Sequence, residues 1–364
     1  MSSIEHLYFH VPFCTHICPY CAFYKTRNLM SDMRPFIPAL KKEIRWHLEH
    51  YEIEPLTVYF GGGTPSALSI KQLEDLVADW PWNEIEEFTM ECNPETITNK
   101  KARLLNLWGV NRISLGVQAF DNHSLKLLGR THNKHRVQKS VEILREEGFE
   151  NISIDLMFAL PGQTMEAWGN SLQETVFLKP EHVSCYNLNY EEDTVFLERF
   201  KRGQYQSNET QEKDFFYRGI NALSQAGYQQ YEISNYARNG YESKHNQACW
   251  SGKDYLGFGP SACSTIGNAR WKNIANVHEY SRGWQKGKRL GNSESLDHHI
   301  KRNERIILGL RTSRGVEAEY FLGKEQQLKD LVHEGLMIEI DGGHHTLTNR
   351  GKLVADSITE LLVG

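Results

Sequence analysis

The chain has 364 residues, of which 40% are apolar and 11% aromatic, which suffices for one large domain and a smaller one. Its formal net charge of -5 at pH 7 gives no basic field, so we expect no nucleic-acid partner. No run approaches about eighteen apolar residues, and the opening stretch MSSIEHLYFHVPF lacks the pattern of a signal peptide. We therefore expect no stable membrane insertion, and the odd count of seven cysteines favours a reducing compartment, the cytoplasm.

Six short strands are predicted in the first half of the chain, where aromatic and β-branched residues concentrate. They are expected at residues 6–11, 56–60, 87–92, 112–117, 151–158 and 182–188. Helical patterns follow the first five strands, for example over 33–50 and 69–80. This alternation predicts an α/β fold with a parallel sheet. Because six units are too few for an eight-stranded barrel, we expect an open, partial (β/α)6 barrel over residues 1–190.

The second half of the chain is predicted to hold two further parts. Residues 191–290 are irregular and are expected to complete the barrel opening, with a helix over 209–226. Residues 297–364 are expected to form a smaller domain, in which helices over 298–310 and 324–335 precede a hairpin with Asp-Gly-Gly at its turn. Helices followed by a hairpin predict a winged-helix-like shape. Since this segment is not notably basic, a cap or docking role is expected and not DNA binding.

Three cysteines follow the first strand within the stretch FCTHICPYC: Cys14, Cys18 and Cys21. A structural zinc site is closed by four ligands, and a ferredoxin-type cluster is held by four cysteines, so three cysteines leave one metal position open. The favoured interpretation is a [4Fe-4S] cube with three irons on these thiolates. The alternatives are a zinc site that borrows His16, or thiols with no metal.

Distinctive motifs also follow the other predicted strands. GGGTP follows the second strand, ECNPE ends the third, GVQAF ends the fourth, and Asp155 lies within the fifth. Because the carboxyl ends of parallel strands meet at one rim, we expect these motifs beside the cysteines. Glycines without β-carbons let the backbone approach a ligand closely and adopt positive φ, although a simple turn is the alternative.

The spacing CxxxCxxC is similar to the signature of the radical S-adenosylmethionine enzymes, in which the amino and carboxylate groups of that cofactor chelate the open iron. Over nearly the whole chain, motifs such as ECNPE, SLGVQAF and IDLMFALPGQ resemble a narrower family, that of coproporphyrinogen III oxidase-like proteins. This family contains the oxygen-independent coproporphyrinogen III oxidase (HemN) and HemW, which is regarded as a heme chaperone.

The resemblance implies that Cys14, Cys18 and Cys21 hold the cluster and that eight other residues line the cofactor site. Those expected to face the S-adenosylmethionine bound at the cluster are Tyr8, Gly62 and Glu91. Five further residues match positions that, in the oxidase, contact a second cofactor molecule or line the far side of the site. They are Gly63, Thr64, Gln118, Arg130 and Asp155. The resemblance leaves open whether this protein binds a second cofactor molecule. A carboxylate side chain can accept hydrogen bonds from the ribose hydroxyls of the cofactor or pair with its positively charged sulfonium group. An arginine can pair with the carboxylate of the cofactor.

Departures from the oxidase point to the HemW-like branch. The oxidase has a longer arm before its first strand and a further cysteine two residues after the third, where this chain has Phe23. HemW-like proteins carry a motif HNxxYW, which HNQACW matches except that Cys249 stands at the tyrosine position. His245 and Cys249 are therefore candidate heme ligands, with His16 as a competitor. The alternative is that the motif only fixes a loop by hydrogen bonds.

The resemblance thus implies a cytoplasmic heme chaperone with a [4Fe-4S] cluster, S-adenosylmethionine and heme. Its implied partners are an electron donor for the cluster and the proteins that accept heme. The alternative of a different class is a radical enzyme that acts on a porphyrin, such as coproporphyrinogen III. A radical enzyme acting on an unrelated substrate is the third interpretation.

Overall fold

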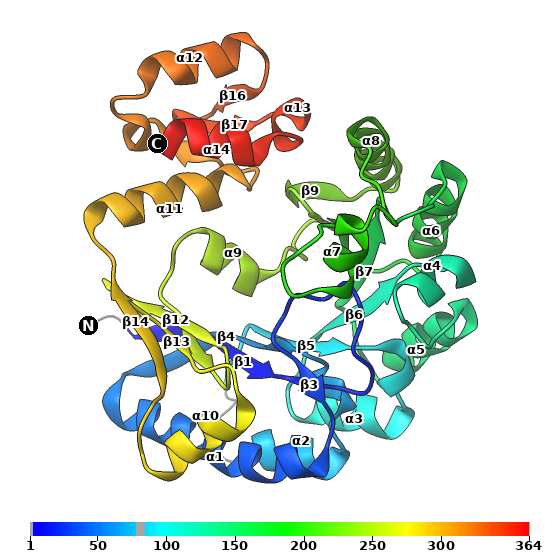
Figure 1. The fold of residues 1–364 in the computed structure, drawn as a ribbon, viewed down its shortest axis with the longest axis vertical. Helices are drawn as coiled ribbons and strands as arrows, with labels where there is room; N and C mark the ends of the chain where they lie inside the picture. Colours follow the sequence, from blue (N-terminus) through cyan, green and yellow to red (C-terminus); the bar gives the residue numbers. More distant parts are fainter. Residues whose placement is uncertain (1–2, 78–83, 364) are drawn as a thin grey trace.

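The computed structural model describes residues 3–77 and 84–363 of the chain, and a curved sheet forms its centre (Figure 1). Its six central strands are β1 (Ile4–Val11), β4 (Ile53–Gly62), β5 (Glu87–Cys92), β6 (Arg112–Gln118), β7 (Ile152–Phe158) and β8 (His182–Asn187). Neighbouring strands among these six run parallel and follow one another in chain order. They coincide with the six predicted strands, and the predicted open α/β barrel is confirmed.

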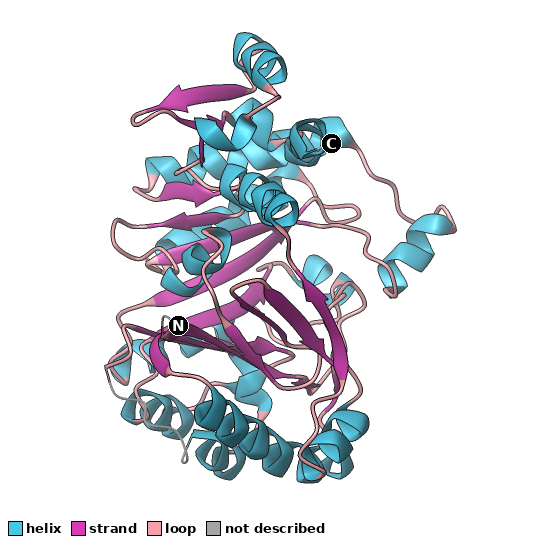
Figure 2. Cartoon of the chain, turned by 90° about the vertical axis from the view of Figure 1, so that its left-hand side faces the viewer, coloured by secondary structure: helices cyan, strands magenta, loops and turns pink. Residues whose placement is uncertain are grey.

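Helices cover the outer side of this sheet (Figures 1 and 2). They are α1 (Met30–His50), α2 (Ile70–Val77), α3 (Asn99–Leu107), α4 (Asn122–Leu127), α5 (Lys134–Glu146), α6 (Met165–Phe177) and α8 (Glu209–Gln225). The predicted helix over 69–80 corresponds to α2, and its residues 78–80 lie outside the described part of the chain. None of the helices in the described part is long and apolar enough to cross a membrane.

Three short strands extend the sheet at its edges. At one edge β11 (Leu256–Phe258) pairs parallel with β1; at the other, β10 (Asn235–Ala237) and β9 (Gln229–Glu232) pair antiparallel beyond β8. The full order is β11-β1-β4-β5-β6-β7-β8-β10-β9. The sequence analysis predicts none of the three, because strands of three or four residues are too short to show a periodicity.

The core lies on both faces of the central strands, as is typical of a parallel sheet covered by helices. In β7 every residue except Asp155 is buried. At the opposite edge the ring of Phe9 stacks between those of Phe60 and Phe258, with centroids 4.4 and 4.7 Å apart. Burying one such side chain contributes roughly 1.5–3 kcal/mol, so this stack fixes β11 onto the barrel.

The segment after β8 adds helices and a second sheet. Its elements are α7 (Val195–Lys201), α9 (Lys244–Trp250), α10 (Val277–Gln285) and the antiparallel strands β12 (Cys263–Ile266), β13 (Ala269–Asn273) and β14 (Gly291–Ser295). Figure 1 shows α9 at the opening of the curved sheet, opposite the outer helices. The helix predicted over 209–226 is confirmed as α8.

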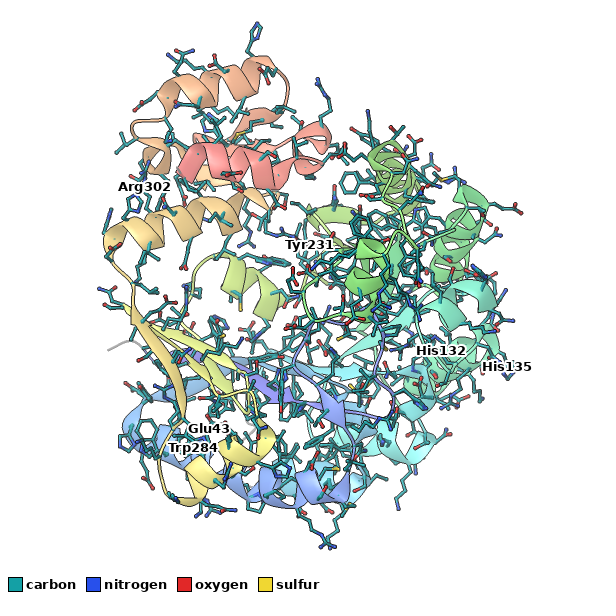
Figure 3. All side chains as sticks on the ribbon, viewed as in Figure 1. Glu43, His132, His135, Tyr231, Trp284 and Arg302 are labelled. Carbon is teal, nitrogen blue, oxygen red and sulfur yellow. The ribbon has the colours of Figure 1, made fainter. Side chains whose placement is uncertain are left out.

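A buried carboxylate joins this segment to α1. Glu43 accepts hydrogen bonds from the Tyr280 hydroxyl at 2.5 Å, the Asn273 amide at 2.6 Å and the Gly259 N–H at 2.7 Å. Burial raises the pKa of Glu43 to about 7. Figure 3 shows Glu43 of α1 near Trp284 of α10, the helix that also carries Tyr280.

The C-terminal part has its own small sheet and its own apolar cluster. Its elements are α11 (His298–Leu310), β15 (Val316–Glu317), α12 (Glu325–His333), β16 (Met337–Ile340), β17 (His344–Leu347), α13 (Asn349–Lys352) and α14 (Ala355–Val363). The predicted helices and hairpin are confirmed, and the strands are ordered β15-β17-β16. Ile306, Leu310, Phe321 and Ile358 belong to its buried cluster.

Candidate cluster and cofactor site

The loop with the three cysteines leaves the carboxyl end of β1. Its two ends are tied together because β2 (Phe13–Cys14) pairs with β3 (Thr26–Arg27). Helix α7 packs against its middle, where the Phe196 N–H donates to the Pro19 carbonyl at 3.2 Å. Cys14, Cys18 and Cys21 are free thiols, partly exposed on this loop.

Hydrogen-bond donors surround the cysteines. The Thr64 hydroxyl lies 3.7 Å from the sulfur of Cys14, and Nη1 of Arg130 lies 3.7 Å from the sulfur of Cys18. Lys25 donates to the backbone carbonyl of Cys21. Donors of this kind to ligand sulfurs tune iron–sulfur clusters.

Burial affects the ionisation of the cysteine thiols. Desolvation raises the pKa of Cys14 to about 11, so a bound cation would be needed to hold this thiol as a thiolate. In the described part of the chain, no three His, Cys, Asp or Glu side chains converge on a single ion position. A zinc site needs its ligands around one ion, whereas in an iron–sulfur cube each thiolate binds a different iron.

Glycines at the end of β4 and directly after it make room for the segment that leads to the cysteines. Gly62 has φ +104°, and a β-carbon there would lie 2.6 Å from the His10 ring. A β-carbon on Gly63 would lie 2.7 Å from the carbonyl carbon of Pro12. The close approach permits hydrogen bonds that end with the Thr64 N–H on the Phe13 carbonyl at 2.8 Å. The glycines therefore place the Thr64 hydroxyl against Cys14.

Glu91 lies at the end of β5, with its carboxylate held in a fixed orientation. The Tyr59 hydroxyl donates to one oxygen at 2.9 Å and the Gly62 N–H to the other at 3.2 Å. Burial raises the pKa of Glu91 to about 7. The Tyr8 ring lies 6.1 Å from that of Tyr59, and its hydroxyl lies 3.1 Å from Nδ1 of His10. The structure thus brings Tyr8, Gly62 and Glu91 together.

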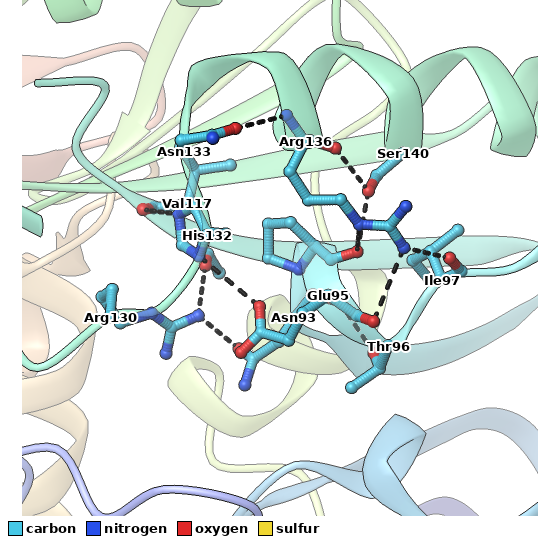
Figure 4. A network of polar contacts seen from close by, with 12 residues as sticks. Asn93, Glu95, Thr96, Ile97, Val117, Arg130, His132, Asn133, Arg136 and Ser140 are labelled. Atoms are coloured by element: carbon cyan, nitrogen blue, oxygen red, sulfur yellow. Dashed lines mark hydrogen bonds and ion pairs between the residues drawn. The ribbon is translucent and has the colours of Figure 1, made fainter. Parts of the chain in front are cut away.

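Arg130 joins the cysteine loop to β6 and to the loop after β5; Figure 4 shows its contact with Asn93. Its Nη2 donates to Oδ1 of Asn93 at 2.5 Å and to the Gly116 carbonyl at 2.6 Å. Asn93 in turn donates to the Thr64 hydroxyl at 3.2 Å. A polar chain therefore runs from Cys14 through Thr64, Asn93 and Arg130 to Cys18. The sequence analysis does not single out Asn93, although ECNPE contains it.

Further contacts hold the loop after β5, as Figure 4 shows. Arg136 donates from Nε to the Pro94 carbonyl at 3.0 Å, and Ser140 donates to the same carbonyl at 2.8 Å. His132 bonds the Val117 carbonyl at 3.0 Å, next to Gln118. Gln118 ends β6 with φ +68°, a conformation that costs about 1–3 kcal/mol and concentrates at functional sites.

Asp155 lies in the middle of β7, level with Gly116 of β6. The Ser114 hydroxyl donates to it at 2.8 Å and the Ser153 hydroxyl at 3.3 Å. Burial raises its pKa. Besides burial, the nearby Asp155 carboxylate also raises the pKa of Glu91.

The HNQACW motif forms most of α9, whose N-terminus is docked on β5. The Glu87 carboxylate accepts from the Lys244 N–H at 2.8 Å, the His245 N–H at 3.0 Å and the Ser243 hydroxyl at 3.2 Å. These contacts join residues about 157 positions apart in the chain. Because of this separation, the sequence analysis does not identify Glu87.

His245 points into the barrel and is only 4% exposed. Its Nδ1 lies 2.9 Å from the Thr57 hydroxyl, which also bonds His6 at 2.9 Å, and its ring centroid lies 5.2 Å from that of Tyr59. Burial lowers the pKa of His245 to about 3, so the imidazole is neutral. Cys249 is one turn further along α9, and burial raises its pKa to about 12.

The chain is similar to several known proteins. A family model described as Radical SAM superfamily matches residues 8–174. Heme chaperone HemW of Lactococcus lactis is 38% identical over 97% of this chain and 96% of that protein, and heme chaperone HemW of Bacillus subtilis is 35% identical over 98% of each. The solved structure of coproporphyrinogen III oxidase (HemN) from Escherichia coli, a radical SAM enzyme, aligns with a TM-score of 0.85 over 99% of this chain and 90% of that one, at 24% identity.

A curved parallel sheet with CxxxCxxC on the loop after its first strand defines a radical SAM protein, a class that implies a [4Fe-4S] cluster and S-adenosylmethionine. Within this class, the chain belongs to the coproporphyrinogen III oxidase-like family and, in that family, to the HemW branch. The likeness to HemN extends to the fold.

Proposed function

We propose that this protein is a heme chaperone, which binds a [4Fe-4S] cluster, S-adenosylmethionine and heme and passes heme to acceptor proteins. The observation that carries the proposal is near-full-length similarity to proteins named heme chaperone HemW, in a chain that keeps the three-cysteine loop. We place the protein in the cytoplasm, because its seven cysteines are all free thiols. A donor protein would supply the cluster with electrons.

We assign the cluster to Cys14, Cys18 and Cys21 and its open iron to S-adenosylmethionine, whose reductive cleavage is the chemistry that such a cluster supplies. Support for the cofactor site comes from Glu91, because a fixed carboxylate beside Tyr8 and Gly62 suits a cationic group. The residues assigned to the far side of the site are Gly63, Thr64, Gln118, Arg130 and Asp155. Thr64 and Arg130 also contact cysteine sulfurs, and Nε of Arg130 is buried without a hydrogen-bond partner among the described residues.

We assign heme to the region of α9, with His245 as the favoured iron ligand and Cys249 as the second candidate. A neutral imidazole is the form that binds iron, and the bond from Nδ1 to Thr57 leaves Nε2 for the metal. The Cys249 thiol would first have to lose a proton against its burial. Since His245 is almost fully buried, heme entry requires α9 or its neighbours to move.

Heme titration of the cluster-replete protein tests this assignment. We expect binding of about one heme per chain, and His245→Ala should weaken binding or shift the Soret band more than Cys249→Ala does. His6→Ala is the matched control, because His6 is a second buried imidazole on the same Thr57 hydroxyl. His16→Ala tests the exposed competitor on the cysteine loop. If both α9 variants keep the affinity and spectrum of the wild type, the heme lies elsewhere and the motif is structural.

The second candidate function is oxidation of coproporphyrinogen III. The observation that favours it is the fold that this chain shares with HemN. Phe23 argues against it, because the oxidase carries a further cysteine at this position and Phe23 is 71% exposed beside the cluster loop. Anaerobic incubation with a reductant, S-adenosylmethionine and coproporphyrinogen III should therefore yield no protoporphyrinogen. Turnover of about 1 per second or more would replace the chaperone proposal, whereas a lack of both turnover and heme binding would point to an unrelated substrate.

A further inference from the structure

Helix α7 contacts the cysteine loop midway between the two paired ends of that loop. The Phe196 N–H donates to the Pro19 carbonyl at 3.2 Å, and the rings of Phe196 and Tyr20 meet edge to face with centroids 6.1 Å apart. Tyr20 also forms a side-chain hydrogen bond with Cys18. Figure 1 shows α7 next to this loop, which is drawn in dark blue. Pro19 and Tyr20, which separate Cys18 from Cys21 in the chain, therefore connect α7 to the cysteines.

This contact belongs to a small satellite core that is separate from the main core of the barrel. Its five buried members are Leu128, Met157, Leu160, Leu188 and Phe196. Tyr20 and Tyr205 pack against them, and the Phe196 side chain is fully buried. Small satellite clusters of this kind typically lie under long loops. Because few side chains hold α7 in place, its contact with Tyr20 is a substantial part of its packing.

The start of α7 is fixed by a local cap. The Thr194 hydroxyl accepts from the Leu197 N–H at 3.2 Å and donates to the Glu191 carbonyl at 2.6 Å. Such a cap satisfies backbone groups that the first turn of a helix leaves unpaired. Both bonds stay within residues 191–197, so the stability of α7 can be changed at Thr194 without altering any residue of the cysteine loop.

We propose that α7 and the [4Fe-4S] cluster stabilise each other, so that α7 acts as a clamp on the cysteine loop. The inference rests on the proposed assignment of the cluster to the three loop cysteines. A cluster bound to Cys18 and Cys21 would fix the loop on both sides of Pro19 and Tyr20, and these two residues hold Phe196. Without the cluster, only hydrogen bonds and packing hold them, so α7 opens more often. Because such coupling is reciprocal, a less stable α7 makes the cluster easier to remove.

The first test measures how fast a chelator removes iron from the anaerobically reconstituted protein, followed by the visible absorption of the cluster. Thr194→Ala should accelerate the loss about fivefold, equivalent to about 1 kcal/mol, which is the usual effect of a lost N-cap. Thr194→Ser keeps the hydroxyl and should lose iron at nearly the wild-type rate. The reason is that iron leaves from the state in which α7 is open, and removal of the cap raises the population of that state.

Thr348→Ala is the matched control for Thr194→Ala. The Thr348 hydroxyl caps α13 in the same manner, because it accepts from the Gly351 N–H at 3.1 Å and donates to the Gly335 carbonyl at 2.8 Å. This helix belongs to the C-terminal part of the chain, which has its own apolar cluster. Thr348→Ala should therefore leave the rate of iron loss unchanged.

Hydrogen exchange followed by mass spectrometry gives a second measurement that does not depend on substitutions. The backbone amides of α7, residues 195–201, should exchange faster in the cluster-free wild type than in the reconstituted protein, since α7 opens more often there. The amides of α6, residues 165–177, should exchange equally in both forms, because α6 is one of the helices on the outer side of the sheet.

Equal rates of iron loss in Thr194→Ala and Thr348→Ala would overturn the inference and leave the proposed function intact. Identical exchange of α7 in the cluster-free and reconstituted proteins would do the same. Failure of the wild type to take up iron would instead remove the proposed cluster, and the inference with it.

Discussion

Alanine at Cys14, Cys18 or Cys21 is expected to reduce the iron content of the anaerobically reconstituted protein from about four irons per chain to near zero. In the proposed assignment each thiolate is the single protein ligand of its iron, so a cube with one thiolate missing would have two irons without protein ligands. The measurements are iron and sulfide analysis, together with the paramagnetic spectrum of the reduced protein. Addition of S-adenosylmethionine should perturb that spectrum in the wild type.

Cys263→Ala provides the matched control for this experiment. Cys263 is a partly exposed free thiol on β12, away from the loop, and its removal should leave the iron content unchanged. Retention of a full cluster by any of the three loop variants would contradict the assigned ligands. Stoichiometric zinc with no uptake of iron by the wild type would contradict the cluster itself.

Glu87→Ala is expected to lower the free energy of unfolding by about 3 kcal/mol or more. The substitution leaves the Ser243 hydroxyl and the N–H groups of Lys244 and His245 without their acceptor at the buried start of α9. It also removes a charge that balances the buried Arg112 guanidinium. Urea unfolding monitored by circular dichroism measures the change, and Glu87→Gln, which keeps one oxygen acceptor, should cost less.

The neighbouring Glu86 supplies the control for Glu87→Ala. Glu86 is exposed, and its carboxylate pairs with the Lys244 ammonium at 2.6 Å, so Glu86→Ala should unfold close to the wild-type midpoint. Because α9 carries the proposed heme ligands, Glu87→Ala should also weaken heme binding. Equal destabilisation by the two substitutions would show that the docking of α9 does not depend on the buried carboxylate.

The central fold could be predicted from the sequence because parallel strands buried on both faces appear as apolar runs. The β7 segment ISIDLMF is such a run, and the following helices have an amphipathic pattern. The edge strands β9, β10 and β11 could not be predicted, because they have only three or four residues. In addition, β10 and β11 pair with β8 and β1, which are distant in the chain.

The rim of the site could be predicted for a topological reason: the carboxyl ends of parallel strands share one edge. Thr64 and Arg130 do lie against cysteine sulfurs. The contacts between rim residues could not be predicted, since Tyr59 and Glu91 are 32 residues apart and meet only when β4 and β5 pair. Likewise, HNQACW gives no sign that His245 faces the barrel interior while Trp250 faces the C-terminal part, which the docking of α9 on Glu87 determines.

Hydrogen bonds from the protein reach all three thiols of the cysteine loop. Thr64 and Arg130 each contact one sulfur and are connected by Asn93, while the Phe23 N–H contacts the sulfur of Cys21 and Lys25 binds its backbone carbonyl. Part of the conformational entropy of ordering the loop is therefore lost during folding of the barrel and not during cluster assembly. Assembly of a cluster on a loop ordered in this way would cost less conformational entropy than assembly on a free loop.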